Sequence, residues 1–196
     1  MSTPAPSSPF RPLRFGVTGV HLRDGEPGTH YLSADQALQA YPERLTDRFL
    51  HWAAVAPDRT WVARRAPAAT PGGVSGDWQH VSYAQGLAQA RSIAQALLDR
   101  GLSAERPVVI LSENSLEHAL MVVGCMLAGV PFVPASPAYS LISTDYEKLR
   151  HVLRTVTPGL VFASDAARYG KAMAATQAEG VECVLVNGAV DGLAST

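Results

Sequence analysis

Hydrophobic positions in the second half of the chain follow two alternating spacings. Short runs such as Val108–Leu111 and Val184–Val186 are apolar at successive positions. Longer stretches between them carry apolar residues every three or four positions. The first spacing is typical of strands buried on both faces, and the second is typical of amphipathic helices. The chain is therefore predicted to form strands at 107–112, 130–134, 159–163 and 182–186.

Polar capping residues and helix-ending residues set the limits of the helices in this half. The capping sequences begin at Ser82, Asn114 and Thr144, each followed by Gln or Glu three residues later, and Asp165 caps a fourth helix. Glycines or prolines close these segments. The predicted helices cover 82–100, 114–128, 144–157 and 165–178.

The longest apolar run, residues 119–135, could be taken for a membrane span. We interpret it as the end of one buried helix followed by a buried strand. Pro131 and Pro134 would break a spanning helix, and only about a dozen apolar residues precede them.

The first half of the chain predicts smaller elements. An Asp24-Gly25 turn lies between two β-prone segments and predicts a hairpin over residues 14–32. Apolar residues at helical spacing predict a helix between Pro42 and Pro57, and its Phe49/Trp52 pair is expected to pack in the core. Strands are predicted at 60–64 and 78–81, as an antiparallel pair joined by a Gly- and Pro-rich loop.

Taken together, these patterns predict an α/β fold. It consists of an open, mostly parallel sheet with helices on both faces, joined by right-handed crossovers, plus an N-terminal β hairpin. The predicted domains are a disordered tail over 1–13, a β hairpin and linker over 14–41, an α/β subdomain over 42–187 and an unstructured end over 188–196.

Composition narrows the functional classes. The 196 residues carry 16 Lys and Arg against 17 Asp and Glu, for a net charge of −1, with 47% hydrophobic and 17% charged residues. This balance argues against disorder and gives no electrostatic footprint for nucleic acid or an anionic membrane. The two cysteines suggest a reducing compartment, and residues 1–12 lack the apolar core of a signal peptide. We therefore expect a cytoplasmic protein.

Candidate chemistry is expected where the parallel strands end. Ligands of open parallel sheets bind beyond the carboxyl ends of the strands, which points to the loops after Leu111, Pro134 and Phe162. Helix capping suffices to explain the polar residues of the first and third loops. The second loop, 135–143, combines stiff prolines with hydroxyl groups and could bind a polar ligand, although a rigid connector is the alternative. Its candidate site residues are Ser136, Pro137, Tyr139 and Ser140.

Sequence motifs for other sites are absent. The six histidines show no metal-ligand spacing, and neither cysteine belongs to a CxxC pair. The sequence contains no GxSxG elbow, and no GxGxxG follows a strand. The residues alone therefore predict a soluble α/β domain with no catalytic residue and no metal site.

Four stretches between Gln79 and Ala163 resemble, in order and spacing, the N-terminal region of the AMP-forming acyl-CoA synthetases. They are VSYAQ at 81–85, the alanine- and leucine-rich helix 88–101, PVVILSENSLE at 107–117 and LAGVPFVPASP at 127–137. The details SPAYSLIS, TDYEKLRHVL and LTDRFLHWAAVAPDRTWVARR are most similar to feruloyl-CoA synthases.

The resemblance implies a piece of a larger enzyme. It implies that the fold is a subdomain of the synthetase large domain, and that the parent ligates a hydroxycinnamate to CoA with ATP and Mg. The family's phosphate loop, acidic Mg-ATP motif and C-terminal lysine have no counterpart in this sequence. We therefore expect this chain to be an inactive N-terminal fragment that binds no cofactor itself. Its partners would be the remainder of the ligase and, in that parent, a small aromatic acid and CoA, and it could form a homo-oligomer.

In some relatives, the loop that matches Ser136–Ser140 lies near the CoA channel and carries a basic residue. Here Ala138 and Tyr139 stand at those positions, so the resemblance does not carry that role over. The alternative to a ligase fragment is a non-catalytic α/β binding or interaction module.

Overall fold

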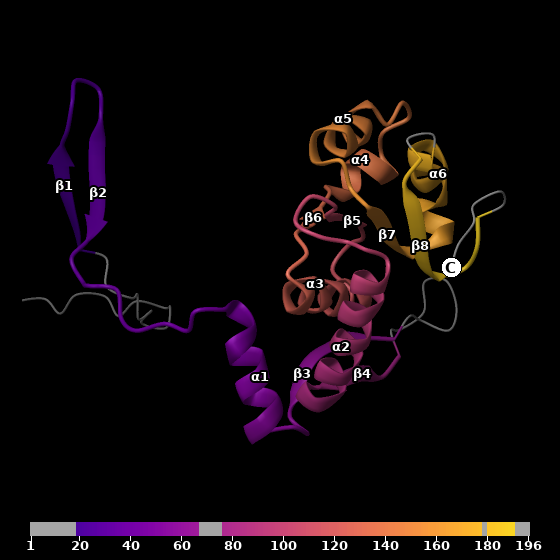
Figure 1. Ribbon diagram of the computed structural model, residues 1–196, viewed down its shortest axis with the longest axis horizontal. Helices are drawn as coiled ribbons and strands as arrows, with labels where there is room; N and C mark the ends of the chain where they lie inside the picture. Colours follow the sequence, from indigo (N-terminus) through magenta and orange to yellow (C-terminus); the bar gives the residue numbers. More distant parts are fainter. Residues whose placement is uncertain (1–18, 67–75, 178–179, 191–196) are drawn as a thin grey trace, which may run out of the picture. The chain divides into compact units, whose positions relative to one another are not determined.

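The computed structural model describes residues 19–66, 76–177 and 180–190 (Figure 1). The expected disordered tail at 1–13 and most of the unstructured end at 188–196 lie outside the described residues. The chain divides into two compact units, Met1–Tyr41 and Pro42–Thr196.

The first unit contains a β hairpin. Strands β1 (Val20–Asp24) and β2 (His30–Ala34) pair antiparallel, with Leu22 opposite Leu32. The backbone N–H of Gly25 donates to the carbonyl of Thr29 at 2.9 Å, which closes the turn. The predicted hairpin is present, but β2 continues two residues beyond the predicted end at 32, and residues 15–18 of the predicted first strand lie outside the described residues.

The second unit begins with helix α1 (Leu45–Val55), followed by the antiparallel strands β3 (Thr60–Arg65) and β4 (Trp78–Ser82). Phe49 is buried, and its ring meets the ring of Trp61 edge-on at a centroid distance of 4.7 Å. The prediction that Phe49 packs in the core is therefore confirmed. For Trp52 the same prediction is wrong, because its side chain is 37% exposed, with the guanidinium of Arg59 over its ring.

A four-stranded parallel sheet forms the centre of the second unit (Figure 1). Its strands are β5 (Val108–Leu111), β6 (Phe132–Pro134), β7 (Leu160–Asp165) and β8 (Glu182–Asn187). Their order is β6-β5-β7-β8, so the chain runs outward from β5 to one edge and then returns past β5 to the other. All four strands overlap predicted strands, although β7 continues to Asp165, past its predicted end at 163, and β8 continues to Asn187, past its predicted end at 186.

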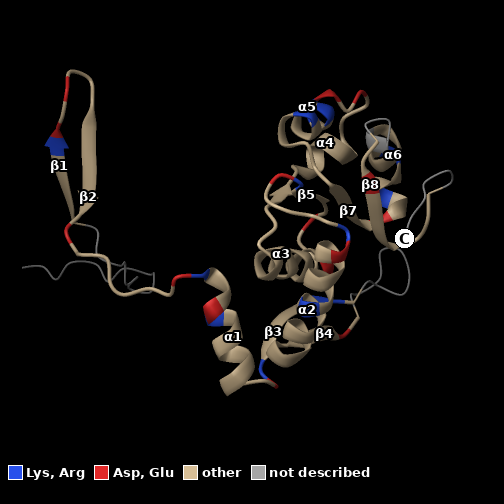
Figure 2. Ribbon diagram, viewed as in Figure 1, with Lys and Arg blue, Asp and Glu red and all other residues tan. Residues whose placement is uncertain are grey.

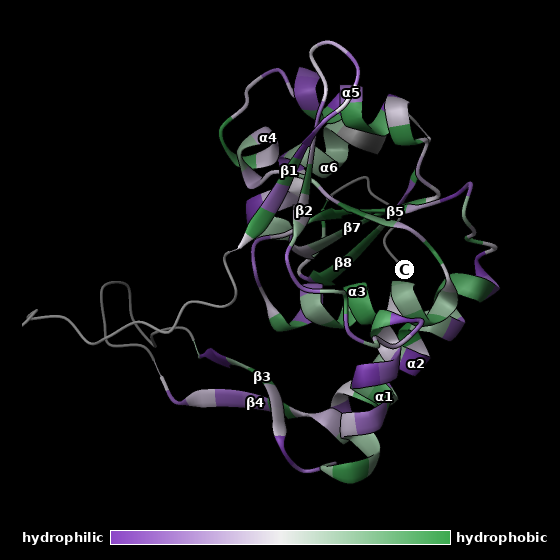
Figure 3. Ribbon diagram, turned by 90° about the vertical axis from the view of Figure 1, so that its left-hand side faces the viewer, coloured by the Kyte–Doolittle hydropathy of each residue, from purple (hydrophilic) through white to green (hydrophobic). Residues whose placement is uncertain are grey.

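Helices cover both faces of this sheet, as predicted. Val109 and Val161 face α5 (Glu147–Val156) and α6 (Ala166–Gln177), in a cluster with Leu149 and Met173. The alternate strand residues, among them Ile110 and Phe162, face α2 (Tyr83–Asp99) and α3 (Leu116–Ala128). Figure 3 shows the hydrophobic strands lying between these helical layers. Because both strand faces are buried, the apolar runs need no polar alternation.

One predicted helix start is confirmed and two differ from the structure. The predicted capping box at Ser82 and Gln85 is present. For α3, however, the cap is Ser115 rather than Asn114: the hydroxyl of Ser115 accepts the backbone N–H of His118 at 3.1 Å. The predicted box at Thr144 does not form. Instead α5 begins after Tyr146, whose φ is 55°, and Asp145 accepts the N–H of Glu147.

The segment predicted as a loop after β6 contains a short helix, α4 (Pro137–Leu141). Proline suits the first turn of a helix because no intrahelical partner is needed there for its missing N–H. The apolar run 119–135 forms the end of α3 and then β6, as predicted. Across the described residues, no helix is both long and apolar enough to cross a bilayer. Figure 2 shows basic and acidic residues interspersed on the described part of the chain.

Candidate functional site

The chain takes opposite directions after the neighbouring strands β5 and β7. These strands are neighbours, but the chain leaving β5 leads to α3 on one face and the chain leaving β7 leads to α6 on the other. Ligands of open α/β sheets bind where the following segments diverge in this way. The candidate site is therefore this carboxyl edge.

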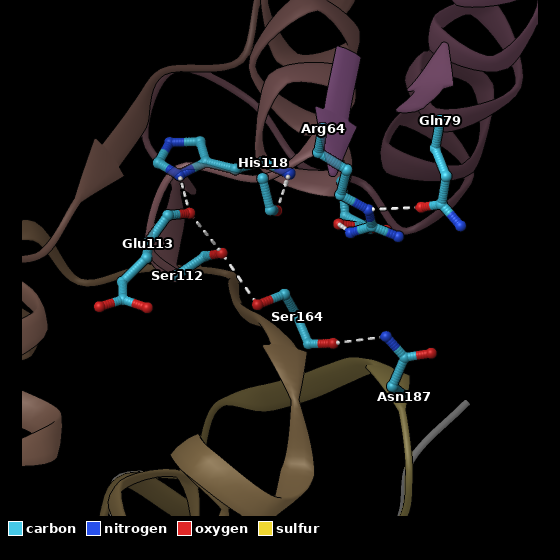
Figure 4. A network of polar contacts seen from close by, with 9 residues as sticks. Arg64, Gln79, Ser112, Glu113, His118, Ser164 and Asn187 are labelled. Atoms are coloured by element: carbon cyan, nitrogen blue, oxygen red, sulfur yellow. Dashed lines mark hydrogen bonds and ion pairs between the residues drawn. The ribbon is translucent and has the colours of Figure 1, made fainter. Parts of the chain in front are cut away.

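A row of polar groups joins three strand ends there (Figure 4). The side-chain oxygen of Ser112 lies 2.9 Å from both the carbonyl of Glu113 and the hydroxyl of Ser164. Since Ser112 has one proton and a carbonyl only accepts, Ser164 is the donor to Ser112 when Ser112 donates to the carbonyl. The Asn187 amide in turn donates to the carbonyl of Ser164 at 3.2 Å. These bonds fix the ends of β5, β7 and β8 relative to one another.

An ion pair crosses the same edge. The guanidinium of Arg168, in the first turn of α6, donates to the carboxylate of Glu113, which follows β5. This hydrogen bond and the positive charge of Arg168 hold the pKa of Glu113 below its ordinary value. The same hydrogen bond and the negative charge of Glu113 raise the pKa of Arg168. Both side chains are about half exposed, so solvent screens the pair.

His118 projects from the first turn of α3 beside this ion pair. Its ring nitrogen Nδ1 lies 3.2 Å from the carbonyl of Glu113. A carbonyl oxygen accepts only, so Nδ1 carries the proton in this contact. In the neutral ring, Nε2 then has a free lone pair. Figure 4 shows no partner for this second nitrogen among the residues drawn.

Three hollows open along the edge. The first, of about 490 Å³, lies at the ends of β5 and β6 and is lined by Glu113, Asn114, His118, Pro134, Ser136 and Pro137, among others. The second, of about 500 Å³, lies between α4 and α6 and includes Ser140, Ser143, Thr144, Arg168 and Lys171. The third, of about 330 Å³, lies between β3 and the start of α3, beside Arg64.

The third hollow is closed on one side by paired charges. Arg64 donates to Glu117 in the first turn of α3 and to the side chain of Gln79 on β4, each at 2.9 Å (Figure 4). These bonds fix the β3–β4 pair against α3. Arg64 is thereby already neutralised, and this hollow offers little attraction to an anionic ligand.

The four residues predicted from the sequence fall into two groups. Ser136 and Pro137 line the first hollow. Ser140 lines the second hollow, but it is only 5% exposed and its hydroxyl has no partner among the described residues. Tyr139 packs against the core cluster under α5, with the Lys148 ammonium 5.7 Å from its ring centre. The helix α4 separates side chains that the sequence placed on one loop.

Three further residues of this edge, Glu113, His118 and Arg168, are not among those candidates. Their grouping depends on the order of the strands, because Arg168 follows Glu113 by 55 positions. A histidine at the start of a helix carries no sequence signal unless a metal-ligand spacing accompanies it. These residues could have been found only from the opposite directions that the chain takes after β5 and β7, and these directions are known only once the strand order is known.

The described residues do not form a metal centre: no group of three or more His, Cys, Asp or Glu side chains is placed to hold an ion. Cys125 is buried, which raises its pKa to about 12 and keeps its thiol protonated. The chemistry available at this edge is thus hydrogen bonding by Ser112, Ser136 and His118, with cationic side chains on α6.

Comparison with known proteins gives one family. The profile described as AMP-binding enzyme matches residues 49–194. The match begins within α1 and includes the whole parallel sheet and the loops of the carboxyl edge.

Curated relatives are much longer proteins. A protein described as a nonribosomal peptide synthetase, CymA of Salinispora arenicola, is 32% identical over 159 residues, which is 81% of this chain and 2% of that protein. Tyrocidine synthase 3 of Brevibacillus parabrevis is 32% identical over 77 residues, 39% of this chain and 1% of that protein. The chain thus spans only 1–2% of the length of these two relatives.

Solved structures support the fold. A protein described as a long-chain-fatty-acid CoA ligase from Rhodopseudomonas palustris is 23% identical, with a TM-score of 0.59 over 78% of this chain and 35% of that chain. Coronafacic acid ligase from Pectobacterium brasiliense is 14% identical, with a TM-score of 0.57 over 74% and 26%. A fatty acid AMP ligase from Legionella pneumophila is 19% identical, with a TM-score of 0.53 over 63% and 20%. At these identities the likeness concerns the fold alone.

Proposed function

This chain belongs to the AMP-binding enzyme family, and on that premise we propose that it is the N-terminal part of an ATP-dependent acid–CoA ligase resembling feruloyl-CoA synthase. Enzymes of this family are adenylating ligases. The parent would activate a hydroxycinnamate with ATP, release pyrophosphate, and pass the acyl group from AMP to the thiol of CoA. The profile match over residues 49–194 carries the family assignment.

The feruloyl assignment rests on sequence likeness. It is supported by the stretches LTDRFLHWAAVAPDRTWVARR and SPAYSLIS. The relatives named above include peptide synthetases and fatty acid ligases, so ferulate as the acid substrate is proposed from sequence likeness and not from these relatives. We also propose a cytoplasmic location.

The groups that the parent needs do not fit the residues described here. Stabilising the charge that develops on a phosphoryl group requires a cradle of donors and cations, with Mg²⁺ held by carboxylates. Within the described residues, no three His, Cys, Asp or Glu side chains are grouped to hold a metal ion. We therefore assign no step of adenylation to this chain.

Under the proposal, residues 42–187 supply scaffold and part of the wall of the ligand cleft, and residues 14–41 form a hairpin and linker. The carboxyl edge supports this role because the polar row Ser112, Ser164 and Asn187 fixes the strand ends beneath the first hollow. Ser136, Pro137, Tyr139 and Ser140 remain proposed cleft residues for the acid or CoA.

The test is a comparison of acids on the protein encoded by the complete reading frame. Pyrophosphate release and acyl-CoA formation would be measured with ferulate, a long-chain fatty acid and a set of amino acids. We expect ferulate with CoA to give the highest kcat/KM. Faster turnover of fatty or amino acids would replace the feruloyl assignment while leaving the family unchanged.

The same assay on the 196-residue chain separates a fragment from a complete enzyme. We expect no acyl-adenylate and no acyl-CoA from ferulate, ATP and CoA, because the sequence lacks the phosphate loop and the adenylating lysine. Turnover by this chain, free of longer ligase, would contradict the proposal. A reading frame that ends at Thr196 would instead favour a non-catalytic binding or interaction module.

A further inference from the structure

His118 lies at the carboxyl edge, where it lines two hollows, as its neighbour Asn114 does. One is the hollow of about 490 Å³ at the ends of β5 and β6, and the other is the hollow of about 330 Å³ beside β3. Its ring stands at the first turn of α3, where the chain diverges from the path taken after β7. Neither the family assignment nor the polar row of Ser112 and Ser164 uses this side chain.

The hydrogen bond to Glu113 determines what the ring can offer a ligand. With Nδ1–H directed to the Glu113 carbonyl at 3.2 Å, the neutral ring presents Nε2 as an acceptor. The backbone beneath the ring is fixed as well, since the N–H of His118 donates to the Ser115 hydroxyl at 3.1 Å. An acceptor held in this way loses little entropy when it binds a donor.

The lining of the larger hollow shows which donors suit it. Among the described residues that line it, Glu113 alone has a formal charge, and that carboxylate is engaged by Arg168. The hollow therefore offers no cation to a carboxylate or phosphate. Pro134 and Pro137 add apolar ring surface to its lining, and Ser136 adds a hydroxyl. Such a lining favours a neutral group that carries one donor beside an apolar surface.

We propose that His118 Nε2 is a ligand-binding acceptor, which takes a hydrogen bond from a neutral O–H or N–H of a ligand lying against Pro134 and Pro137. This inference rests on the proposed function for the identity of that ligand. In the proposed reaction, the donor is either the phenolic hydroxyl of the hydroxycinnamate or an amide N–H of the pantetheine arm of CoA.

The experiment measures binding to the protein encoded by the complete reading frame, labelled with ¹⁵N at histidine, because the 196-residue chain supplies only part of the proposed cleft. In the phenol arm, ferulate is compared with its 4-O-methyl ether, which keeps the ring and carboxylate but lacks the donor. In the amide arm, the probe is pantetheine. Acceptance of a hydrogen bond is seen as a shift of the His118 Nε2 resonance, with Nδ1 still protonated.

Two variants test the role of the nitrogen. His118→Phe keeps a planar ring without an acceptor, and His118→Gln keeps an acceptor near the position of Nε2. We expect His118→Phe to weaken binding of the active probe by about tenfold, the usual effect of one lost hydrogen bond, and His118→Gln to restore part of it. His151→Phe on α5, which removes an exposed histidine outside the hollow, is the matched control and should bind as the unmodified chain does.

The Glu113 carbonyl keeps the Ser112 hydroxyl as a partner in His118→Phe, so we expect that variant to fold. If it does not, the ¹⁵N shifts of the unmodified chain and the His118→Gln variant still decide the matter. A shift with ferulate but not its ether assigns the phenol, and a shift with pantetheine assigns the amide. No shift with either probe, or unchanged binding in both variants, overturns the inference.

The outcome is separable from that of the ligase assay. If the complete protein ligates an acid to CoA but the His118 resonance does not shift, only this inference is overturned. If the His118 resonance shifts but the complete protein has no ligase activity, only the proposed function is overturned.

Discussion

Glu113 and Arg168 couple the end of β5 to the first turn of α6, and their pairing gives the chain a pH-dependent contact. Because the pKa of Glu113 is lowered in the folded chain, its contribution to stability is complete above the pKa of the unfolded carboxyl, about 4.3, and is lost as pH falls through the lower folded value. We expect Glu113→Gln to be less stable than the unmodified chain at pH 7.

The difference should persist down to about pH 4.3 and disappear only in more acidic solution. Urea unfolding of both proteins over this range measures it. Glu43→Gln is the matched control, because Glu43 is exposed and its carboxylate has no hydrogen bond or ion pair among the described residues. A difference that grows as the solution is acidified would contradict the assignment of the contact.

Gly86 has no side chain, and this allows helix α2 to pack closely against strand β3. A Cβ at this position of α2 would lie 2.7 Å from the indole ring of Trp61 and 3.3 Å from the ring of Phe49. We expect Gly86→Ala to destabilise the chain by about 1–3 kcal/mol, despite the better helix propensity of alanine.

Thermal unfolding followed by circular dichroism tests this prediction. The control Ala88→Gly removes a methyl group from an exposed turn of the same helix, and should cost about 1 kcal/mol through propensity alone. If Gly86→Ala proved more stable than the unmodified chain, the tight packing against Trp61 would be refuted.

At the scale of single elements, two adjacent residues at the start of α3 are both of a type that caps helices, but only one of them does so. Ser115 accepts the N–H of His118, whereas Asn114 is exposed and makes no such bond. We expect Ser115→Ala to lower the free energy of unfolding by about 1 kcal/mol and Asn114→Ala to leave it within about 0.5 kcal/mol. Equal losses in urea unfolding would show that the cap is shared.

Helix α3 also tests the distinction between a buried helix and a membrane anchor. Leu120 is buried in the second unit, so Leu120→Ala should cost about 2–5 kcal/mol. Leu127 is only partly buried, and Leu127→Ala should cost less. Leu98→Ala on α2, at 49% exposure, is the control and should have little effect on thermal unfolding. Partitioning of the unmodified chain into detergent would contradict burial.

The strands could be predicted from the sequence because each is apolar on both faces, which leaves few alternatives for a run such as Val108–Leu111. The cap of α3 could not, since Asn and Ser are equally good caps and only the backbone path selects Ser115. Helix α4 has five residues, too few for a periodic pattern. The pairing of Glu113 with Arg168 depends on strand order, which local patterns do not encode.

At the scale of the whole molecule, the chain leaves large apolar side chains exposed for its size. In the hairpin unit they include Leu22 and Leu32, at 66% and 67%, which lie opposite each other. In the second unit they include Leu45 at 81% and Ile142 at 78%. Strand β8 is an edge of the parallel sheet among the described strands, with Val186 at 47% exposure. Exposed edges and apolar patches promote association.

We therefore expect the purified chain to associate with itself, as a dimer or as larger species that grow with concentration. Burial of apolar surface drives this association, so raising the salt concentration should not weaken it, as it would weaken an association held by charge pairs. Sedimentation at several protein concentrations, each at low and high salt, measures both effects.

The double variant Leu22→Thr with Leu32→Thr removes one apolar pair while keeping residues suited to strands, and Leu45→Glu places a charge on α1. Whichever variant restores a smaller species identifies the surface used. A chain that remains monomeric at every concentration would be a self-sufficient domain, and the non-catalytic binding module would become the better account of it.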